Sequence, residues 1–219
     1  ATILANPGAD VIVTHGTDTM AFTGAALAQA LAGSGRRVVL CGAMVPLDMG
    51  GDGEANLDLA LAAARTAAPG VWLAFAGQLM PAGGLAKIDS HAAEAFTALP
   101  QPPAPIRNAP RFADRKLAIL TMSPGLPATA LDAMLGAVDG AVLRVFGAGT
   151  AMSDPAIRAV LHAATRRGCR IRAVSQCLQG GLTPGAYAAG ECLWSAGVEN
   201  GGTETPEAAL IRLWLDLSA

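Results

Sequence analysis

The stretch DVIVTHGTDTMAFTGAALAQALA, residues 10–32, joins two contrasting patterns and decides the fold class of the chain. The stretch predicts a buried strand over 10–16, from its branched apolar residues at 11–13, and a helix over 19–32, from its alanine-rich run. The two patterns meet in a polar junction, residues 14–19, which carries hydroxyl groups, an imidazole and a carboxylate. A short apolar strand that passes through such a junction into a helix begins a βαβ unit, so the stretch predicts a parallel sheet.

The same alternation continues through the first hundred residues. Strand patterns follow at 36–43 and 70–77, and a helix pattern at 54–68 separates them. The loops after these strands carry polar residues, and ligands of an open parallel sheet bind at the carboxyl ends of its strands. We therefore expect three polar loops to meet at one edge of the sheet: 15–19, 43–53 and 78–91.

A proline-rich segment, residues 99–110, interrupts this pattern with five prolines in twelve positions. Proline fixes the backbone and removes hydrogen-bond donors, so the segment is predicted to be a linker. We expect two α/β lobes, residues 1–98 and 111–219, on either side of it. In the second lobe the predicted strands are 116–121, 140–146 and 170–176, and the predicted helices are 127–137, 153–168 and 205–217.

The composition excludes several classes of function. Apolar residues make up 52% of the chain and charged residues 15%, which favours a folded domain, and no apolar run is long enough to predict a membrane span. The net charge is −2 and the arginines are scattered, so no basic surface for nucleic acid is predicted. The four cysteines lack any metal-ligand spacing. We expect buried free thiols, no metal and no cofactor.

Lysine is rare in this chain. The chain contains only two lysines, Lys87 and Lys116, but thirteen arginines. Arginine keeps its charge under ordinary conditions, whereas a desolvated lysine can lose its proton. A lysine within one of the predicted polar loops is therefore a candidate for moving protons.

The polar junction allows two interpretations. In the first, Thr17 or Asp18 only caps the following helix, a common role for these residue types. In the second, Gly16 lets the backbone come close to a ligand, Thr17 and Asp18 stand at the mouth of a crevice, and Thr19 caps the helix. The residues of this stretch do not by themselves decide between the two.

A longer comparison favours the second interpretation. VIVTHGTDTM at 11–20 resembles a signature of the bacterial-type L-asparaginases, and GAMVPLDMGGDGEANLDLALAAA at 42–64 resembles the next segment of that family. LAKIDSHAAEAF at 85–96 is similar to the segment that carries the catalytic lysine, and residues 174–210 are similar to the ending of the cytoplasmic type I branch. The resemblance implies a three-layer N-terminal lobe with a parallel sheet, a smaller α/β C-terminal lobe, and a cytoplasmic location.

The resemblance also implies roles for individual residues. Members of this family hydrolyse the side-chain amide of asparagine through a threonine acyl-enzyme. Thr17 would be one of two catalytic threonines, Asp18 would bind the α-amino group of the substrate, and Lys87 would complete a Thr-Lys-Asp group. Gly16 and the backbone of Ala43 would border the substrate. These roles suit the chemistry, because a carboxylate binds an ammonium strongly and a hydroxyl needs a base before it attacks.

The three histidines receive no catalytic role from the sequence. His15 is predicted to support the junction through hydrogen bonds, because the family does not use it as a base. His91 is predicted at the start of a helix after Lys87, and His162 on the face of a helix.

One family motif does not occur in this sequence. The resemblance implies a second catalytic threonine in a Thr-Gly-Gly-Thr-Ile motif on a strand before residue 1, and we expect that segment to be encoded upstream of Ala1. Without that strand, residues 11–13 would form an exposed sheet edge. The sequence NGGTETP at 200–206 looks similar, but it is predicted to be a loop and a helix cap. The second lobe also departs from the family at Thr150, near which an asparagine is expected.

Three functions therefore remain open. The first is hydrolysis of L-asparagine by a homodimer or homotetramer that binds neither nucleic acid nor a membrane. The second is a subunit that supplies ammonia to a tRNA-dependent amidotransferase, a relative with the same fold and signature. The third is an inactive relative that serves as a binding or scaffold protein. Ammonia release from free asparagine by the protein alone separates the first function from the other two.

Overall fold

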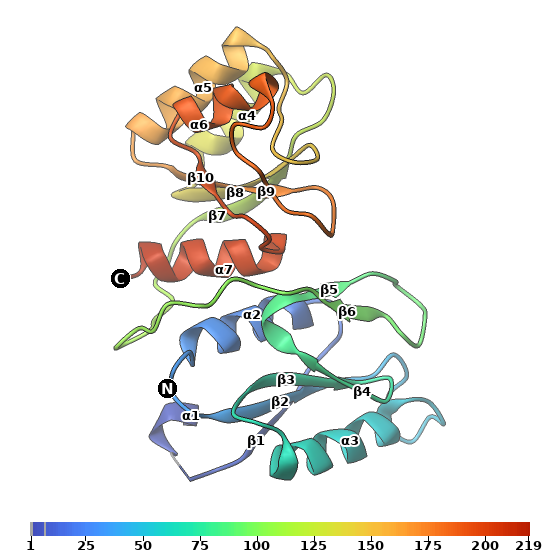
Figure 1. Ribbon diagram of the computed structural model, residues 1–219. Helices are drawn as coiled ribbons and strands as arrows, with labels where there is room; N and C mark the ends of the chain where they lie inside the picture. Colours follow the sequence, from blue (N-terminus) through green and yellow to red (C-terminus); the bar gives the residue numbers. More distant parts are fainter. Residues whose placement is uncertain (1, 7) are drawn as a thin grey trace. The chain divides into compact units, whose positions relative to one another are not determined.

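The computed structural model describes residues 2–6 and 8–219 of the protein, and the chain divides into two compact units (Figure 1). The N-terminal unit comprises residues 1–99 and 103–108, and the C-terminal unit comprises residues 100–102 and 109–219. The proline-rich segment at 99–110 is thus divided between the two units.

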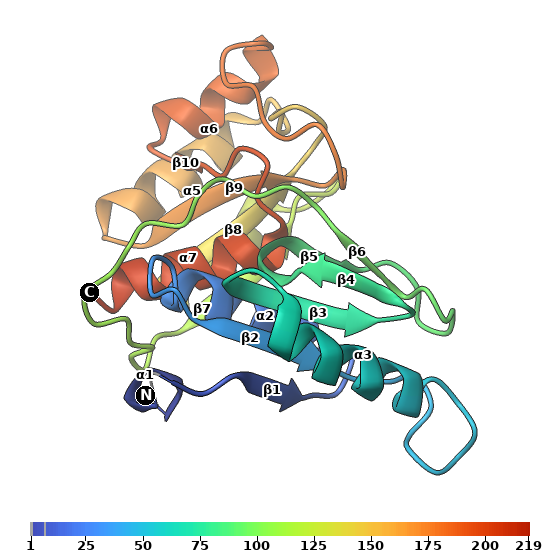
Figure 2. The same ribbon diagram turned by 60° about the horizontal axis from the view of Figure 1, so that its bottom comes forward.

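A four-stranded sheet forms the centre of the N-terminal unit. Its first three strands run parallel and the fourth runs antiparallel to the third, in the order β1-β2-β3-β4 (Figure 2). In this unit the strands are β1 (Val11–Thr14), β2 (Arg37–Cys41), β3 (Gly70–Phe75), β4 (Gln78–Pro81), β5 (Leu85–Lys87) and β6 (Phe96–Ala98), and the helices are α1 (Thr2–Ala5), α2 (Met20–Ala30), the 3₁₀ helix η1 (Ala82–Gly84) and α3 (Gly53–Thr66).

Helices cover both faces of this sheet (Figures 1 and 2). Successive side chains of a strand point to opposite faces, so Val38 and Leu40 of β2 pack in the cluster on the α2 side. Val39 and Cys41 of the same strand pack in the cluster on the α3 side. Because both faces are buried, the strand is apolar without alternation. The predicted three-layer lobe with a parallel sheet is confirmed.

Strand β1 lies at one edge of this sheet (Figure 2). It pairs with β2 from Val11, opposite Val38, to Thr14, opposite Cys41. Its three apolar residues, Val11–Val13, are half-buried, whereas four of the five residues of β2 are buried. The apolar stretch at 11–13 therefore forms a partly buried edge strand of the sheet.

The segment predicted as a loop at 78–91 is in part regular structure, and that prediction was wrong. A tight turn at Ala76 and Gly77, both with positive φ, returns the chain from β3 into β4. After η1, β5 pairs antiparallel with β6. His91 lies in the turn between β5 and β6, not at a helix start, and its N–H donates to Asp89 at 2.7 Å. The strands have three or four residues, too few to show a hydrophobic period.

The C-terminal unit contains a second sheet, with four parallel strands in the order β10-β9-β8-β7. Helices α4 and α5 pack against one face in a large apolar cluster, and α7 covers the other face through Ala209. The strands are β7 (Leu117–Thr121), β8 (Gly140–Val145), β9 (Arg170–Ser175) and β10 (Glu199–Asn200), and the helices are α4 (Ala128–Gly136), α5 (Pro155–Arg166), the 3₁₀ helix η2 (Ala188–Gly190), α6 (Glu191–Ser195) and α7 (Pro206–Leu217).

Two helices of this unit begin at capping side chains, within two residues of the predicted starts at 153 and 205. Asp154 accepts from the N–H of Ala156 at the start of α5, and Thr205 accepts from the N–H of Ala208 at the start of α7. The sequence at 200–206 is a loop and a cap as predicted, although Asn200 also ends the two-residue strand β10.

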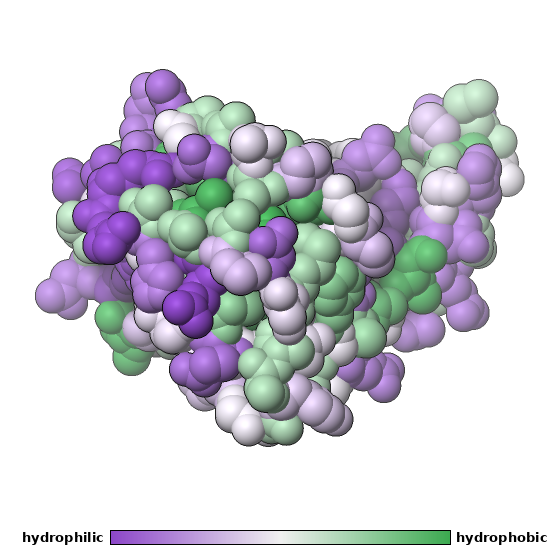
Figure 3. Space-filling view, turned by 90° about the horizontal axis from the view of Figure 1, so that it is seen from above, coloured by the Kyte–Doolittle hydropathy of each residue, from purple (hydrophilic) through white to green (hydrophobic). Residues whose placement is uncertain are grey.

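The surface of the protein is mixed in character. On the face shown in Figure 3, hydrophilic residues are interspersed with hydrophobic ones. Among residues 2–6 and 8–219, no helix is long and apolar enough to cross a membrane. All four cysteines are free thiols, and Cys41 and Cys169 are buried as expected, but Cys177 is exposed.

Candidate functional site

The junction after β1 meets a lysine from a distant part of the chain. Lys87 Nζ donates to Thr17 Oγ1 at 2.9 Å and to Asp18 Oδ1 at 2.8 Å. The lysine lies 70 residues after Thr17 in the sequence. The structure thus brings three of the predicted site residues into one hydrogen-bonded group, which we call the Thr-Lys-Asp group.

Neither Thr17 nor Asp18 caps helix α2. Thr19 occupies the N-cap position, and its side chain makes no capping hydrogen bond. The carboxylate of Asp18 is instead bonded to Lys87. The capping interpretation of these two residues therefore has no support in the hydrogen bonds of the structure.

Lys87 reaches the junction because it ends β5, directly opposite Phe96 of β6. Phe96 packs edge-on against Phe75 of β3, with ring centroids 5.1 Å apart, which anchors the β5–β6 pair to the sheet. Helix α2 packs against the segment before β5 at Gly24, where a Cβ atom would lie only 2.5 Å from the carbonyl oxygen of Ala82. Glycine at this position lets the helix after Thr17 approach the strand that carries Lys87.

The group combines a shielded lysine with an open carboxylate. The side chain of Lys87 is 21% exposed and that of Asp18 is 93% exposed. The hydrogen bond from Lys87, and then its positive charge, lower the pKa of Asp18 below its ordinary value. Asp18 is therefore a carboxylate at neutral pH, and its exposed side can accept a cation from solvent.

His15 braces the junction, as predicted. Its Nδ1 lies 2.7 Å from the carbonyl oxygen of Gly16, and its Nε2 lies 2.9 Å from Thr23 Oγ1. A carbonyl oxygen can only accept, so Nδ1 carries a proton and donates to Gly16, while Nε2 shares a hydrogen bond with the hydroxyl of Thr23. The imidazole thereby ties the backbone before Thr17 to the first turns of α2.

The other two predicted substrate-binding residues lie at the same carboxyl edge. A Cβ on Gly16 would meet no atom within 4 Å, so this part of the backbone faces open space. Ala43 follows the end of β2 and lines a cavity of about 210 Å³ together with Thr14, His15 and Leu47. No described contact joins Ala43 to the Thr-Lys-Asp group, so its role stays a prediction.

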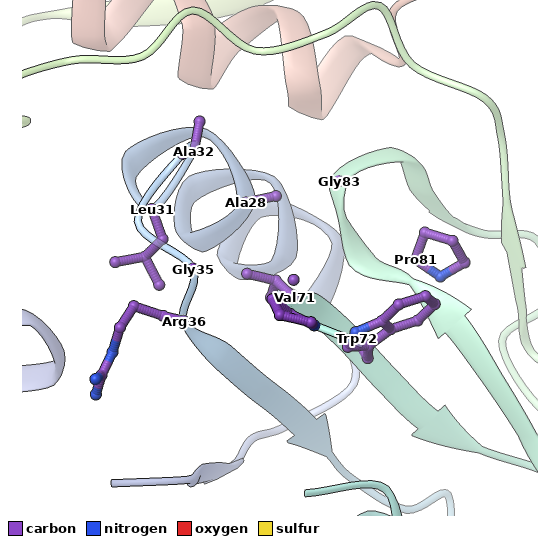
Figure 4. Close-up of a pocket in the computed structure, with 12 residues that line it drawn as sticks. Ala28, Leu31, Ala32, Gly35, Arg36, Val71, Trp72, Pro81 and Gly83 are labelled. Atoms are coloured by element: carbon purple, nitrogen blue, oxygen red, sulfur yellow. The ribbon is translucent and has the colours of Figure 1, made fainter. Parts of the chain in front are cut away.

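A larger cavity of about 480 Å³ lies at the opposite, amino end of β2 and β3 (Figure 4). Trp72, Pro81 and Arg36 line it, and the guanidinium of Arg36 donates to the carbonyl oxygens of Ile3 and Ala9. Among the described residues, no group of histidines, cysteines and carboxylates could hold a metal ion.

Sequence reasoning missed two polar residues at the carboxyl edge. Asp52 and Asn56 hydrogen-bond to the backbone around Ala43. The Asp-Gly-x-x-Asn element at 52–56 was visible as part of a resemblance, but nothing in the sequence indicated which backbone groups these side chains would bind.

The fold and the site together define an α/β protein with a threonine, a lysine and an aspartate at the carboxyl edge of a parallel sheet. Residues 3–115 match the family model described as "Asparaginase, N-terminal", and residues 116–219 match that described as "Glutaminase/Asparaginase C-terminal domain". The chain belongs to the asparaginase family, which confirms the resemblance seen in the sequence.

The chain is also similar to individual proteins, among them two L-asparaginases. The L-asparaginase of Thermococcus kodakarensis is 30% identical over 222 residues, a match that covers 93% of this chain and 68% of the relative. The solved structure of L-asparaginase I from Vibrio cholerae superposes with a TM-score of 0.85 at 33% identity, covering 99% of this chain and 73% of that one. The 60 kDa lysophospholipase of Homo sapiens is 33% identical over 92% of this chain, which spans only 39% of that relative's length.

Proposed function

We propose that the protein hydrolyses the side-chain amide of L-asparagine to L-aspartate and ammonia. The observation that carries the proposal is the contact of Lys87 Nζ with both Thr17 Oγ1 and Asp18 Oδ1. This contact places a proton carrier beside a hydroxyl and next to an exposed carboxylate. Membership of the asparaginase family supports the choice of an amide as the substrate.

In this proposal Asp18 binds the α-ammonium of asparagine. Its carboxylate is 93% exposed, and Lys87 occupies only one of its oxygens with the 2.8 Å contact. A charge-assisted hydrogen bond between a carboxylate and an ammonium is both strong and directional. Asp18 therefore orients the substrate and selects for amides that carry a neighbouring amino group.

Lys87 moves the proton in this proposal. When its amine is neutral, the 2.9 Å contact allows the hydroxyl of Thr17 to donate to Nζ. The oxygen of Thr17 then attacks the amide carbon as its proton passes to the amine of Lys87. The C–N bond then breaks, and the nitrogen takes up that proton and leaves as ammonia. Water cleaves the resulting ester, which returns the threonine hydroxyl and releases aspartate.

The test is ammonia release from free L-asparagine by the purified protein alone. The control substrate is succinamic acid, which is asparagine without its amino group. Asparagine should be turned over and succinamic acid should not. Release that requires a partner protein and tRNA would favour the amidotransferase subunit, and no release under any condition would favour the inactive relative.

We also propose that the protein works as a homodimer or homotetramer in the cytoplasm. Support comes from the resemblance to the type I branch, and light scattering after size exclusion tests it. A single monomeric species at micromolar concentration would contradict this assembly.

A further inference from the structure

Asn56 is the most deeply buried polar residue near the candidate site. It is 1% exposed and lies in the first turn of α3. Its Nδ2 donates to the carbonyl oxygen of Gly42 at 2.9 Å and to Asp52 Oδ2 at 2.9 Å, and its Oδ1 accepts from the N–H of Ala76 at 2.9 Å. One amide thus joins the ends of β2 and β3 to the start of α3.

Asp52 holds the next residues of the same loop. Its carboxylate accepts from the N–H of Met44 at 3.0 Å and from the N–H of Val45 at 2.9 Å. Burial acts to raise the pKa of Asp52, but the bonds from Val45, Met44 and Asn56 contribute to a net lowering below its ordinary value. Asp52 is therefore ionised at neutral pH and keeps both backbone donors bound.

These bonds fix the two peptide groups that flank Ala43. In a planar trans peptide the C=O and the N–H point in opposite directions. The carbonyl of Gly42 points at Asn56, so the N–H of Ala43 points away from Asn56. The N–H of Met44 points at Asp52, so the carbonyl of Ala43 points away from Asp52. Both polar groups of Ala43 are thus turned away from the side chains that clamp the loop.

The clamped loop lies directly beside the junction that carries Thr17. The N–H of His15 donates to the carbonyl oxygen of Cys41 at 2.8 Å. A Cβ on Gly42 would lie 2.4 Å from the carbonyl oxygen of His15, so the two backbones are in close contact. A shift of Gly42 therefore displaces either Ala43 or the backbone that leads into Thr17.

Asn56 also holds a strained residue. Ala76 has a φ of 49°, a left-handed conformation that alanine rarely adopts. Such strain persists where surrounding contacts over-determine the backbone, and the bond from the N–H of Ala76 to Asn56 is one such contact. Asn56 thus hydrogen-bonds to the end of β3 as well as to the loop at Ala43.

We propose that Asn56, together with Asp52, is a positioning residue for amide hydrolysis, and that it orients the backbone groups of Ala43 toward the substrate. The inference rests on the proposed function. Asn56 acts through the loop at 42–45 and does not touch the reacting atoms. Its loss therefore loosens the loop at 42–45 that borders the substrate, while it removes no bond of the Thr-Lys-Asp group.

The test compares Asn56→Ala with Ala63→Gly in the full chain. Ala63 is buried on the same helix, and its replacement weakens α3 without removing a hydrogen bond to the loop. Displacement of a bound substrate by about 1 Å can slow a reaction about 10²-fold, so Asn56→Ala should lower kcat/KM for asparagine by about 10-fold to 10²-fold. Ala63→Gly should lower the melting temperature but change kcat/KM by less than about 2-fold, because it removes no contact to the loop.

Hydrogen exchange supplies a readout that does not depend on activity. Asn56→Ala should accelerate exchange of the amides of Met44 and Val45, and Ala63→Gly should not. If Asn56→Ala does not fold, Asp52→Asn takes its place in both measurements. Asp52→Asn should also lower kcat/KM and accelerate exchange of the amides of Met44 and Val45. In a double variant the two losses should not add, because both side chains act on one loop.

The outcomes separate the two proposals. If the wild type turns over asparagine but the Asn56 and Asp52 variants match Ala63→Gly in both readouts, the positioning role is wrong and the proposed function stands. If the wild type does not release ammonia from asparagine, the proposed function fails and the positioning role fails with it.

Discussion

Replacing Gly24 with alanine should separate Lys87 from Thr17 and slow the proposed reaction. The added Cβ would lie 2.5 Å from the carbonyl oxygen of Ala82, whereas an ordinary contact begins at 3.4 Å. Helix α2 and the segment before β5 must therefore move apart by about 0.9 Å. The same displacement would lengthen the 2.9 Å contact of Lys87 with Thr17 to about 3.8 Å, beyond hydrogen-bonding distance.

The expected loss follows from this displacement. A misplacement of about 1 Å can cost about 10²-fold in rate, so kcat for ammonia release should fall by about 10-fold to 10²-fold. Overpacking typically costs about 1–3 kcal/mol, and the higher helix propensity of alanine offsets up to about 1 kcal/mol of it. The melting temperature should therefore fall slightly, although Gly→Ala within a helix usually raises it.

Gly83→Ala is the matched control, since its Cβ would meet only the Cβ of Ala28, at 3.3 Å, across the same contact. It should keep nearly all of the activity. The reasoning is refuted if Gly24→Ala keeps wild-type kcat, or if the two variants lose activity equally.

Three further substitutions test other parts of the account. Asp18→Asn should lower kcat/KM for asparagine by at least about 10-fold, because it weakens the bond to the substrate ammonium, and steady-state kinetics measure this. Glu204→Ala should destabilise the C-terminal unit by about 3–5 kcal/mol in thermal unfolding, because a carboxylate only 1% exposed is paired with Arg172 at 2.6 Å and Arg212 at 2.8 Å, and its loss removes this partner from Arg212 and leaves Arg172 with Glu199. Glu207→Gln should raise stability at pH 7 and leave it unchanged near pH 3. Burial raises the pKa of Glu207 in the fold, so the unfolded chain ionises first and stability falls as pH rises above the ordinary value. Unfolding midpoints for Glu207→Gln that follow the wild type at every pH would contradict this sign.

The central elements of both units could be predicted from the sequence because their patterns are long or well bounded. The strand at Val11–Val13, the helix after Met20 and the alanine-rich α3 were each predicted, with boundaries within three residues of those observed. Burial on both faces makes each parallel strand a short apolar run, and glycine or proline marks many of its ends. The caps Asp154 and Thr205 each bind an N–H group only two or three residues further along the chain, so local sequence is enough to indicate them.

The contacts that build the site could not be predicted in the same way. Lys87 lies 70 residues from Thr17, and only the resemblance to a family joined the two. Strands β5 and β6 are three residues long, and their pairing depends on Phe96 packing against Phe75, which no local period reveals. Asn56 binds the backbone of Gly42 and of Ala76, which lie 14 and 20 residues away, as well as the side chain of Asp52, so its role depends on the tertiary fold.

The measurement that tests the central claim most directly is the rate of ammonia release by Lys87→Arg. Arginine keeps the positive charge and can still pair with Asp18, but it does not give up its proton. If Lys87 moves the proton of the attacking hydroxyl, kcat should fall by about 10²-fold or more, the contribution of a positioned acid–base group. Lys116→Arg is the matched control, because it replaces the other lysine of the chain, in the C-terminal unit, and it should keep wild-type activity. A folded Lys87→Arg protein that retains most of its kcat would contradict the claim.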